Sequence, residues 1–202
     1  MALDLGPLYP LIKPAAWPGQ EKCITRPLVP GLKLPSQPLV SYCYSTSPFR
    51  AFLGAERLKV IGKTADQAAA EAIENLHKSQ PRCSVTEIDL PQGGKLEVAS
   101  CLEDPFAIER ILHSAFMRHL QEKTFQTKGL AVAIPERPFM FAVPLERALD
   151  GKLLGLARHL YNSSSTEPDD KLSPDVFVLM DGQLCGRVVE EDGKTVVDFV
   201  AA

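Results

Sequence analysis

The segment DVFVLMDGQLCGRVVEEDGKTVVDFV, residues 175–200, decides the fold class of this chain. Two Asp-Gly pairs, Asp181-Gly182 and Asp192-Gly193, divide it into three runs that are rich in β-branched and aromatic residues. A two-residue hairpin turn requires positive φ angles, which Gly adopts without steric cost. The segment therefore predicts a three-stranded antiparallel meander. Its strands are expected at 175–180, 184–191 and 195–200.

The residues before this meander predict two further strands and one helix. Apolar runs at 129–135 and 139–143 are typical of strands. Between 145 and 160, leucines recur at intervals of three and four, which places them on one face of a helix. That stripe either packs in the core or binds a partner. The polar stretch 162–170 is expected to form a mobile loop. The leucines of the stripe are Leu145, Leu149, Leu153, Leu156 and Leu160.

The middle of the chain predicts a β-hairpin. Apolar and polar residues alternate at 84–90 and 95–101, on either side of the turn sequence Pro-Gln-Gly-Gly at 91–94. This pattern is typical of a hairpin with one solvated face. Two other short strands are expected at 39–44 and 57–61.

Helices are predicted on both sides of this hairpin. Thr64 and Gln67 have the spacing of a capping box, in which each side chain satisfies a backbone N–H of the other residue. Asp104 is a suitable N-cap and Pro105 a suitable first helical residue, so a second helix is expected from there to about residue 122.

The N-terminal segment, residues 1–48, contains nine of the seventeen prolines and is expected to be extended or irregular. P-x-x-P occurs three times in it, which is one signature of a polyproline ligand for an SH3-like partner. The prolines alternate with many apolar residues, which favours an ordered segment packed on an α+β domain at 49–202. The three motifs are 7–10, 27–30 and 35–38.

Composition is that of an ordinary globular protein, with 45% hydrophobic and 23% charged residues. The formal net charge of -3 and the lack of clustered Lys and Arg argue against nucleic acid as the main partner. A secretory signal pattern is absent from residues 1–10, and no run of 18 apolar residues occurs, so we expect no membrane association and a cytoplasmic location.

The five cysteines are scattered without a C-x-x-C pair, which fits neither a disulfide framework nor a zinc module. Most are expected to act as small buried apolar residues. Cys83 and Cys101 are an exception, because they lie at opposite ends of the predicted hairpin and could approach each other. In a reducing compartment they are expected to stay thiols.

His119 aligns with apolar residues of the helix predicted to start at Asp104. A buried imidazole needs a hydrogen-bond partner, so a core or interface histidine is one interpretation. The other is a general base in a pocket, which requires a neighbouring carboxylate or nucleophile. His113 is expected on the opposite, polar face, whereas His77 and His159 lie near predicted helix C-termini, where the helix dipole favours a partly charged imidazole.

No pattern of metal ligands, nucleophile elbow or phosphate loop occurs in the sequence, so neither a metal nor another cofactor is expected. Two arginines are candidate binding residues for an anionic group. Arg137 follows a strand and Arg187 lies in the meander, and both are expected to be exposed cations.

Three motifs give the C-terminal part a family resemblance. They are Gly93-Gly94 before 95–101 and the helix at 106–112, then GLAVAIP at 129–135, then LSPDVFVLMDGQL at 172–184. In this order they resemble the uncharacterised bacterial YtpQ-like family, a domain of unknown function. The family continues after the proline with a basic residue and an Asp, whereas Glu136 and Arg137 follow here. The resemblance implies a cytoplasmic bacterial α+β protein and transfers no catalytic residue.

The mixed order of strands and helices predicts an α+β fold, with about three helices on a largely antiparallel sheet. Two functions are compatible with this sequence. One is a non-catalytic module that binds a ligand, a protein partner or a second copy through a sheet edge, the leucine stripe or the Pro-rich segment. The other is a small hydrolase or transferase with a site assembled from distant residues around His119.

Overall fold

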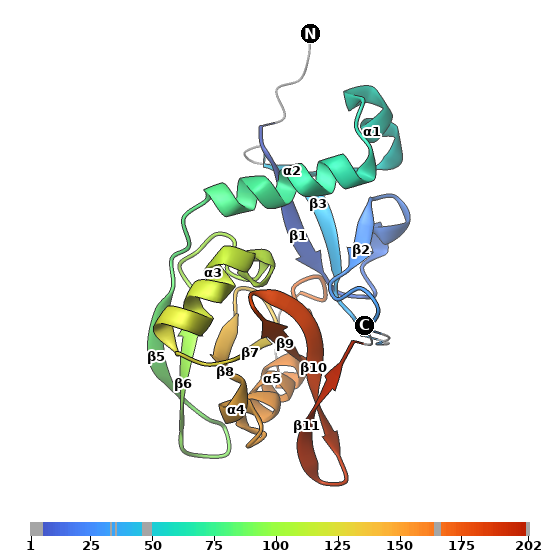
Figure 1. Ribbon diagram of the computed structural model, residues 1–202. Helices are drawn as coiled ribbons and strands as arrows, with labels where there is room; N and C mark the ends of the chain where they lie inside the picture. The colour runs from blue at the N-terminus through green and yellow to red at the C-terminus, as the bar shows by residue number, and fades with distance from the viewer. Residues whose placement is uncertain (1–5, 33, 35, 46–49, 164–166, 201–202) are drawn as a thin grey trace.

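The computed structural model describes residues 6–32, 34, 36–45, 50–163 and 167–200. These residues form two antiparallel sheets with helices packed against them, which confirms the predicted α+β class (Figure 1). They contain five α-helices rather than about three, because one predicted helix is divided and one predicted strand is helical. Within the described part, no helix is long and apolar enough to cross a membrane. The predicted mobile loop at 162–170 includes residues 164–166, which lie outside the described residues.

The smaller sheet is built on β3 (Leu39–Ser45), which confirms the strand predicted there. β1 (Leu8–Lys13) pairs along β3, and β2 (Thr25–Pro27) and β4 (Arg50–Phe52) pair with its two ends. The helix α2 (Ala65–Lys78) lies across β1 and β3 (Figure 1). This sheet crosses the domain boundary predicted between residues 48 and 49, since β4 belongs to it.

Two of the P-x-x-P motifs overlap strands of this sheet. Pro10 lies opposite Tyr42 in the edge strand β1, and Pro27 lies opposite Leu39 in β2. An edge strand tolerates Pro because the missing N–H need not join the ladder. Since Leu8 and Pro10 are buried, the polyproline interpretation is wrong for the first motif. The third motif includes Pro35, which lies outside the described residues.

The strand predicted at 57–61 is wrong, because these residues belong to the helix α1 (Ala55–Ile61). Gly54 precedes the helix in an extended conformation, and Gly62 ends it with a φ of 66°. The apolar pattern was misleading because Val60 is 85% exposed instead of buried. Local capping therefore outweighed β-propensity here.

The larger sheet has seven strands in the order β11-β10-β9-β7-β8-β6-β5. The predicted meander is confirmed at one edge, where Asp181-Gly182 and Asp192-Gly193 have positive φ at all four residues. The predicted hairpin is confirmed at the other edge. The strands are β5 (Ser84–Asp89), β6 (Lys95–Ser100), β7 (Leu130–Ala133), β8 (Phe141–Pro144), β9 (Val176–Met180), β10 (Gln183–Glu191) and β11 (Lys194–Phe199).

Both faces of the larger sheet are covered. In β7, Leu130 and Val132 join the apolar cluster shared with the N-terminal sheet, and Ala131 and Ala133 join a second cluster. That second cluster is covered by α4 (Leu145–Ala148) and α5 (Lys152–Ser163).

These two helices replace the single helix predicted at 145–160. Gly151, with a φ of 78°, lies between them. The leucine stripe packs in the core, which confirms the first of the two interpretations given for it. Leu149 is the exception, since it lies at the break between the helices and is exposed.

The helix predicted from Asp104 to about residue 122 is wrong as a continuous element. A 3-10 helix, η2 (Glu109–Leu112), is followed by α3 (Ser114–His119) and by a single π-helical turn, η3 (Leu120–Thr124). His113, with φ -87° and ψ 83°, interrupts the helix and caps α3 with its own side chain. The break changes which residues face the core, so His119 is exposed instead of buried.

The capping box of α2 yields a first testable prediction. Thr64 Oγ1 accepts from the Gln67 N–H at 3.2 Å, and Gln67 Oε1 accepts from the Thr64 N–H at 2.9 Å. We expect Thr64→Ala to lower the free energy of unfolding by about 1 kcal/mol, measured by urea denaturation. Thr64→Ser keeps the hydroxyl and should stay near wild type. Equal losses in both variants would contradict this role for the cap.

Candidate functional site

An open cleft of about 470 Å³ lies between the start of β5 and the helix α3. Its volume is in the range of small-ligand and side-chain binding sites. Apolar side chains and a few polar groups line it. The lining residues are Gln80, Pro81, Cys83, Ser84 and Val85 on one wall, and His113, Ala115, Phe116, His119, Leu120 and Thr124 on the other.

The wall formed by β5 is also an unpaired edge of the larger sheet. Among the described strands, only β6 is hydrogen-bonded to β5. The Leu90 N–H donates to Gly94 O at 3.0 Å, which shows that Leu90 and Gly94 are a hydrogen-bonded pair of the β5–β6 ladder. Bonded and non-bonded pairs alternate in an antiparallel ladder, so the backbone groups of Val85, Glu87 and Asp89 point away from β6. The cleft therefore lies beside a row of free backbone donors and acceptors.

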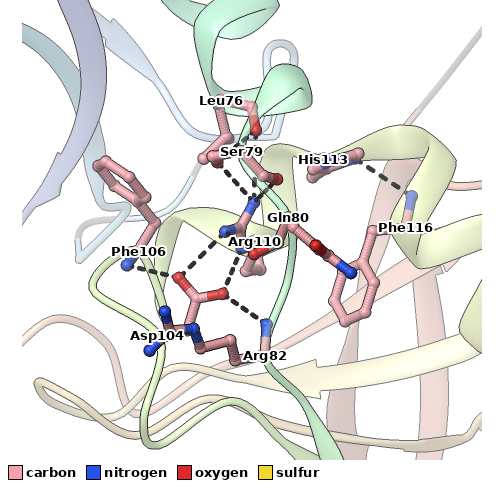
Figure 2. A network of polar contacts seen from close by, with 9 residues as sticks. All are labelled: Leu76, Ser79, Gln80, Arg82, Asp104, Phe106, Arg110, His113 and Phe116. Atoms are coloured by element: carbon pink, nitrogen blue, oxygen red, sulfur yellow. Dashed lines mark hydrogen bonds and ion pairs between the residues drawn. The ribbon is translucent and has the colours of Figure 1, made fainter.

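A buried ion pair fixes the segment that leads into this strand (Figure 2). Arg110 Nε donates to Asp104 Oδ2 at 2.8 Å, and Arg110 Nη2 donates to Asp104 Oδ1 at 3.1 Å. The two side chains are 1% and 0% exposed. Asp104 also accepts the backbone N–H groups of Arg82 and Phe106.

The remaining donors of Arg110 bind carbonyl groups around the C-terminus of α2. Nη1 donates to Leu76 O at 3.3 Å, and to the backbone oxygen and hydroxyl of Ser79, each at 3.0 Å. Nη2 donates to Gln80 O at 3.2 Å. The guanidinium is satisfied by the protein itself, so it positions the cleft wall rather than binding a ligand.

His113 lies between this network and the cleft. Its Nδ1 accepts from the Phe116 N–H at 3.2 Å, which caps α3 (Figure 2). Its ring centroid lies 4.5 Å from that of His77. Burial lowers the pKa of His113, and the nearby His77 and Arg110 lower it further. The expected polar and solvated position of His113 is therefore wrong, and its imidazole is neutral near pH 7 with Nδ1 as an acceptor.

The structure brings Cys83 and Cys101 together, as the hairpin pattern allowed. A hydrogen bond joins the two thiols and lowers the pKa of Cys83, an effect that burial partly offsets. The same bond and burial raise the pKa of Cys101. All five cysteines are free thiols in this structure. Cys83 borders the cleft, whereas Cys101 is completely buried.

His119 borders the cleft but is exposed, so its predicted burial is wrong. The general-base interpretation requires a carboxylate or a nucleophile beside it. No Asp or Glu occurs among the described residues that line this cleft, whereas the thiol of Cys83 is present. His77 is an exposed residue in the last turn of α2, and His159 is an exposed residue of α5 that precedes its last turn.

Arg137 and Arg187 are in ion pairs within the protein, so their predicted exposure as free cations is wrong. Arg137 is 18% exposed and binds Glu109 Oε1 at 2.5 Å and Ile12 O at 2.7 Å. Arg187 is 26% exposed and binds Asp198 at 3.1 Å. Glu109 is 28 residues from Arg137 in sequence, so the sequence pattern did not reveal that pair. Asp198 lies directly opposite Arg187 across the Asp192-Gly193 hairpin. Neither arginine belongs to the cleft lining.

Of the residues singled out in the sequence as candidates for a site or a cysteine pair, the cleft lining includes only His119 and Cys83. Exposed β-strand residues at the end of a hairpin could have indicated a free edge, but the sequence does not tell which hairpin lies at the edge. Within the described residues, no group of three or more His, Cys, Asp or Glu is arranged to hold a metal ion.

The comparisons with known proteins yield no match, since no family model, curated protein or solved structure is significantly similar to this chain. The function is therefore inferred from the site alone.

Removing Arg110 should destabilise the fold strongly. Arg110→Ala leaves Asp104 buried without its partner, which typically costs about 3–5 kcal/mol of unfolding free energy. Arg158→Ala is the matched control, because the Arg158–Glu190 pair is exposed and should be worth less than about 1 kcal/mol. Chemical denaturation of both variants measures the difference. A similar small loss in the two would show that the Asp104–Arg110 network does not hold the fold.

Acid should weaken the wild type through His113. Its pKa is lower in the folded protein than the ordinary 6.5, so the unfolded chain binds more protons as the pH falls below that value. This contribution to stability is present above about pH 6.5 and is lost as the pH falls toward the folded pKa. His113→Asn retains a capping oxygen without titrating there. We expect the wild type to lose stability relative to this variant between about pH 7 and 5, measured by urea denaturation. A constant difference across that range would contradict the assignment.

Proposed function

We propose that this protein is a non-catalytic binding module, and that it binds an extended segment of a partner protein along β5. The observation that carries the proposal is the coincidence of a free strand edge with the cleft beside it. An extended peptide can add a strand to such an edge, so that backbone hydrogen bonds give affinity and a neighbouring pocket gives specificity.

The cleft supports an apolar anchor on the peptide. Val85, Phe116 and Leu120 contribute to its lining. Val85 is 41% exposed, so covering it would remove apolar surface from water. The volume of about 470 Å³ has room for one large side chain and its neighbours.

The charges along β5 support a basic residue on the partner. Glu87 and Asp89 have their side chains on the same face as Val85, since alternate residues of a strand share a face. Lys95 on β6 pairs with Glu87 at 3.2 Å and lies opposite Asp89. Because Lys95 supplies one positive charge beside the two negative charges of Glu87 and Asp89, this end of the strand carries a net negative charge. The proposed partner segment is therefore extended, with an apolar residue for the cleft and a basic residue beside Glu87 and Asp89.

The cytoplasmic location and bacterial origin implied by the YtpQ-like resemblance form part of the proposal, as does a protein partner rather than nucleic acid. The acidic net charge of -3 supports the latter. The hydrolase or transferase alternative around His119 stays a prediction, for which the described cleft lining supplies the thiol of Cys83 but no carboxylate.

A peptide selection on the wild-type protein tests the binding surface. Linear peptides selected from a random phage-displayed library would be synthesised, labelled and measured by fluorescence polarisation. Glu87→Pro removes an N–H that points away from β6, so it should weaken binding at least about tenfold, or about 1.4 kcal/mol. Glu87→Gln keeps the N–H and loses only the carboxylate beside the basic residue of the peptide, so as the matched control it should weaken binding less than Glu87→Pro does.

Selected peptides that bind Glu87→Pro as tightly as wild type would exclude this edge as the binding surface. Wild-type dimers that dissociate on the same substitution, measured by sedimentation, would make a second copy of the chain the occupant instead of a foreign partner.

A further inference from the structure

The cysteines at the start of the β5–β6 hairpin form a matched pair. The register of the two strands runs from Asp89 opposite Lys95 to Ser84 opposite Ser100, and its next step places Cys83 opposite Cys101. The ladder phase set at Leu90 makes this a non-hydrogen-bonded pair, in which Cα atoms lie about 4.5 Å apart and side chains approach closely. That separation lies within the range of natural disulfides.

The two thiols differ in their access to solvent. Cys101 is 0% exposed and packs in the apolar cluster shared by the two sheets. Cys83 is half-buried and borders the cleft. A reagent that enters the cleft can therefore reach Cys83, whereas Cys101 is reachable only through Cys83.

The hydrogen bond between the thiols favours the thiolate form of Cys83. The bond lowers the pKa of Cys83 and raises that of Cys101. The charge of Asp104 raises the pKa of both thiols, so it opposes the effect of the hydrogen bond at Cys83 and adds to it at Cys101. The other three cysteines differ, since burial raises the pKa of Cys23, Cys43 and Cys185. Thiolate is the reactive form of cysteine, so Cys83 combines access with reactivity.

We propose that Cys83 is a thiol-modification site for low-molecular-weight disulfides that enter the cleft, and that Cys101 is its resolving thiol. The proposal rests on the cross-strand pairing, on the access of one thiol alone and on the cleft. It does not rest on the proposed peptide binding.

The reaction is a thiol–disulfide exchange in two steps. The Cys83 thiolate attacks one sulfur of the disulfide, whose S–S bond breaks and releases one thiolate that takes up a proton. Cys101 then loses its proton and attacks Cys83 Sγ, which breaks the mixed disulfide and releases the second small thiol. The two cysteines lose two electrons and two protons, and the small disulfide gains them as two thiols.

Glutathione disulfide is a suitable probe for the folded, reduced protein. After incubation near pH 7, acid quenching, alkylation and peptide mass spectrometry would identify the modified cysteines. We expect wild type to lose two alkylatable thiols and to give a peptide linked through Cys83 and Cys101. Cys83 should react at least about tenfold faster than Cys23 or Cys185, because it borders the cleft and its thiolate form is favoured.

Substitution of the resolving thiol separates the two steps. Cys101→Ala should accumulate a mixed disulfide on Cys83, because nothing displaces the glutathione. Cys185→Ser is the matched control, as it removes a half-buried cysteine outside the pair and should give the same linked peptide as wild type. Circular dichroism would check that each variant is folded.

Several results would overturn the proposal. One is a wild-type protein in which glutathione stays on Cys83 without a link to Cys101. Another is a Cys83 that reacts no faster than Cys23 or Cys185. If Cys101→Ala does not fold, these two wild-type measurements still decide the matter.

Discussion

The buried ion pair between Asp104 and Arg110 is the constraint on which the rest of the structure depends. Such a pair adds little net stability over apolar residues, but loss of either partner leaves a buried charge. The planar guanidinium presents its donors in fixed directions, so its acceptors satisfy it in one arrangement only. Those acceptors lie at the C-terminal end of α2 and in the segment that leads into β5. The pair therefore joins the N-terminal layer to the edge of the larger sheet and fixes one wall of the cleft.

The neighbouring residue, Glu109, makes the corresponding connection to β1. Its carboxylate is completely buried and accepts from the Ile12 N–H at 3.0 Å and from Arg137, which follows β7. Glu109 and Arg110 thus connect two sheets from one short 3-10 helix. A helix of this length has little intrinsic stability, so its conformation comes from these long-range pairs. The predicted helix is interrupted just after them at His113, whose backbone is not helical and whose side chain caps α3.

The dependence of this segment on distant partners limited how much could be predicted from the sequence. The Asp-Gly turns, the hairpin around residues 91–94 and the capping box at Thr64 were predicted correctly, since each depends on residues close together in the chain. The helix from Asp104 and the burial of His119 were wrong, because partners 28 to 97 residues away decide the conformation there. Of the site, the approach of the two hairpin cysteines was predictable from register alone. The free edge was not, because strand order is a property of the whole sheet.

The free backbone groups used in the proposed peptide binding and the thiol used in the proposed exchange both lie on or next to the strand β5. Its outward backbone groups, at Val85 and Glu87, are set by the phase of the ladder, and its first neighbour, Cys83, is set by the same phase. A peptide added to the edge would use the backbone groups, whereas thiol exchange uses the side chain of Cys83. The two activities are therefore separable in chemistry, although they share one wall. They are coupled in structure, because a disulfide to Cys101 would tie β5 to β6 at the end where the Arg82 N–H is held by Asp104. The ion pair that organises the fold thus also supports the strand on which both proposals depend.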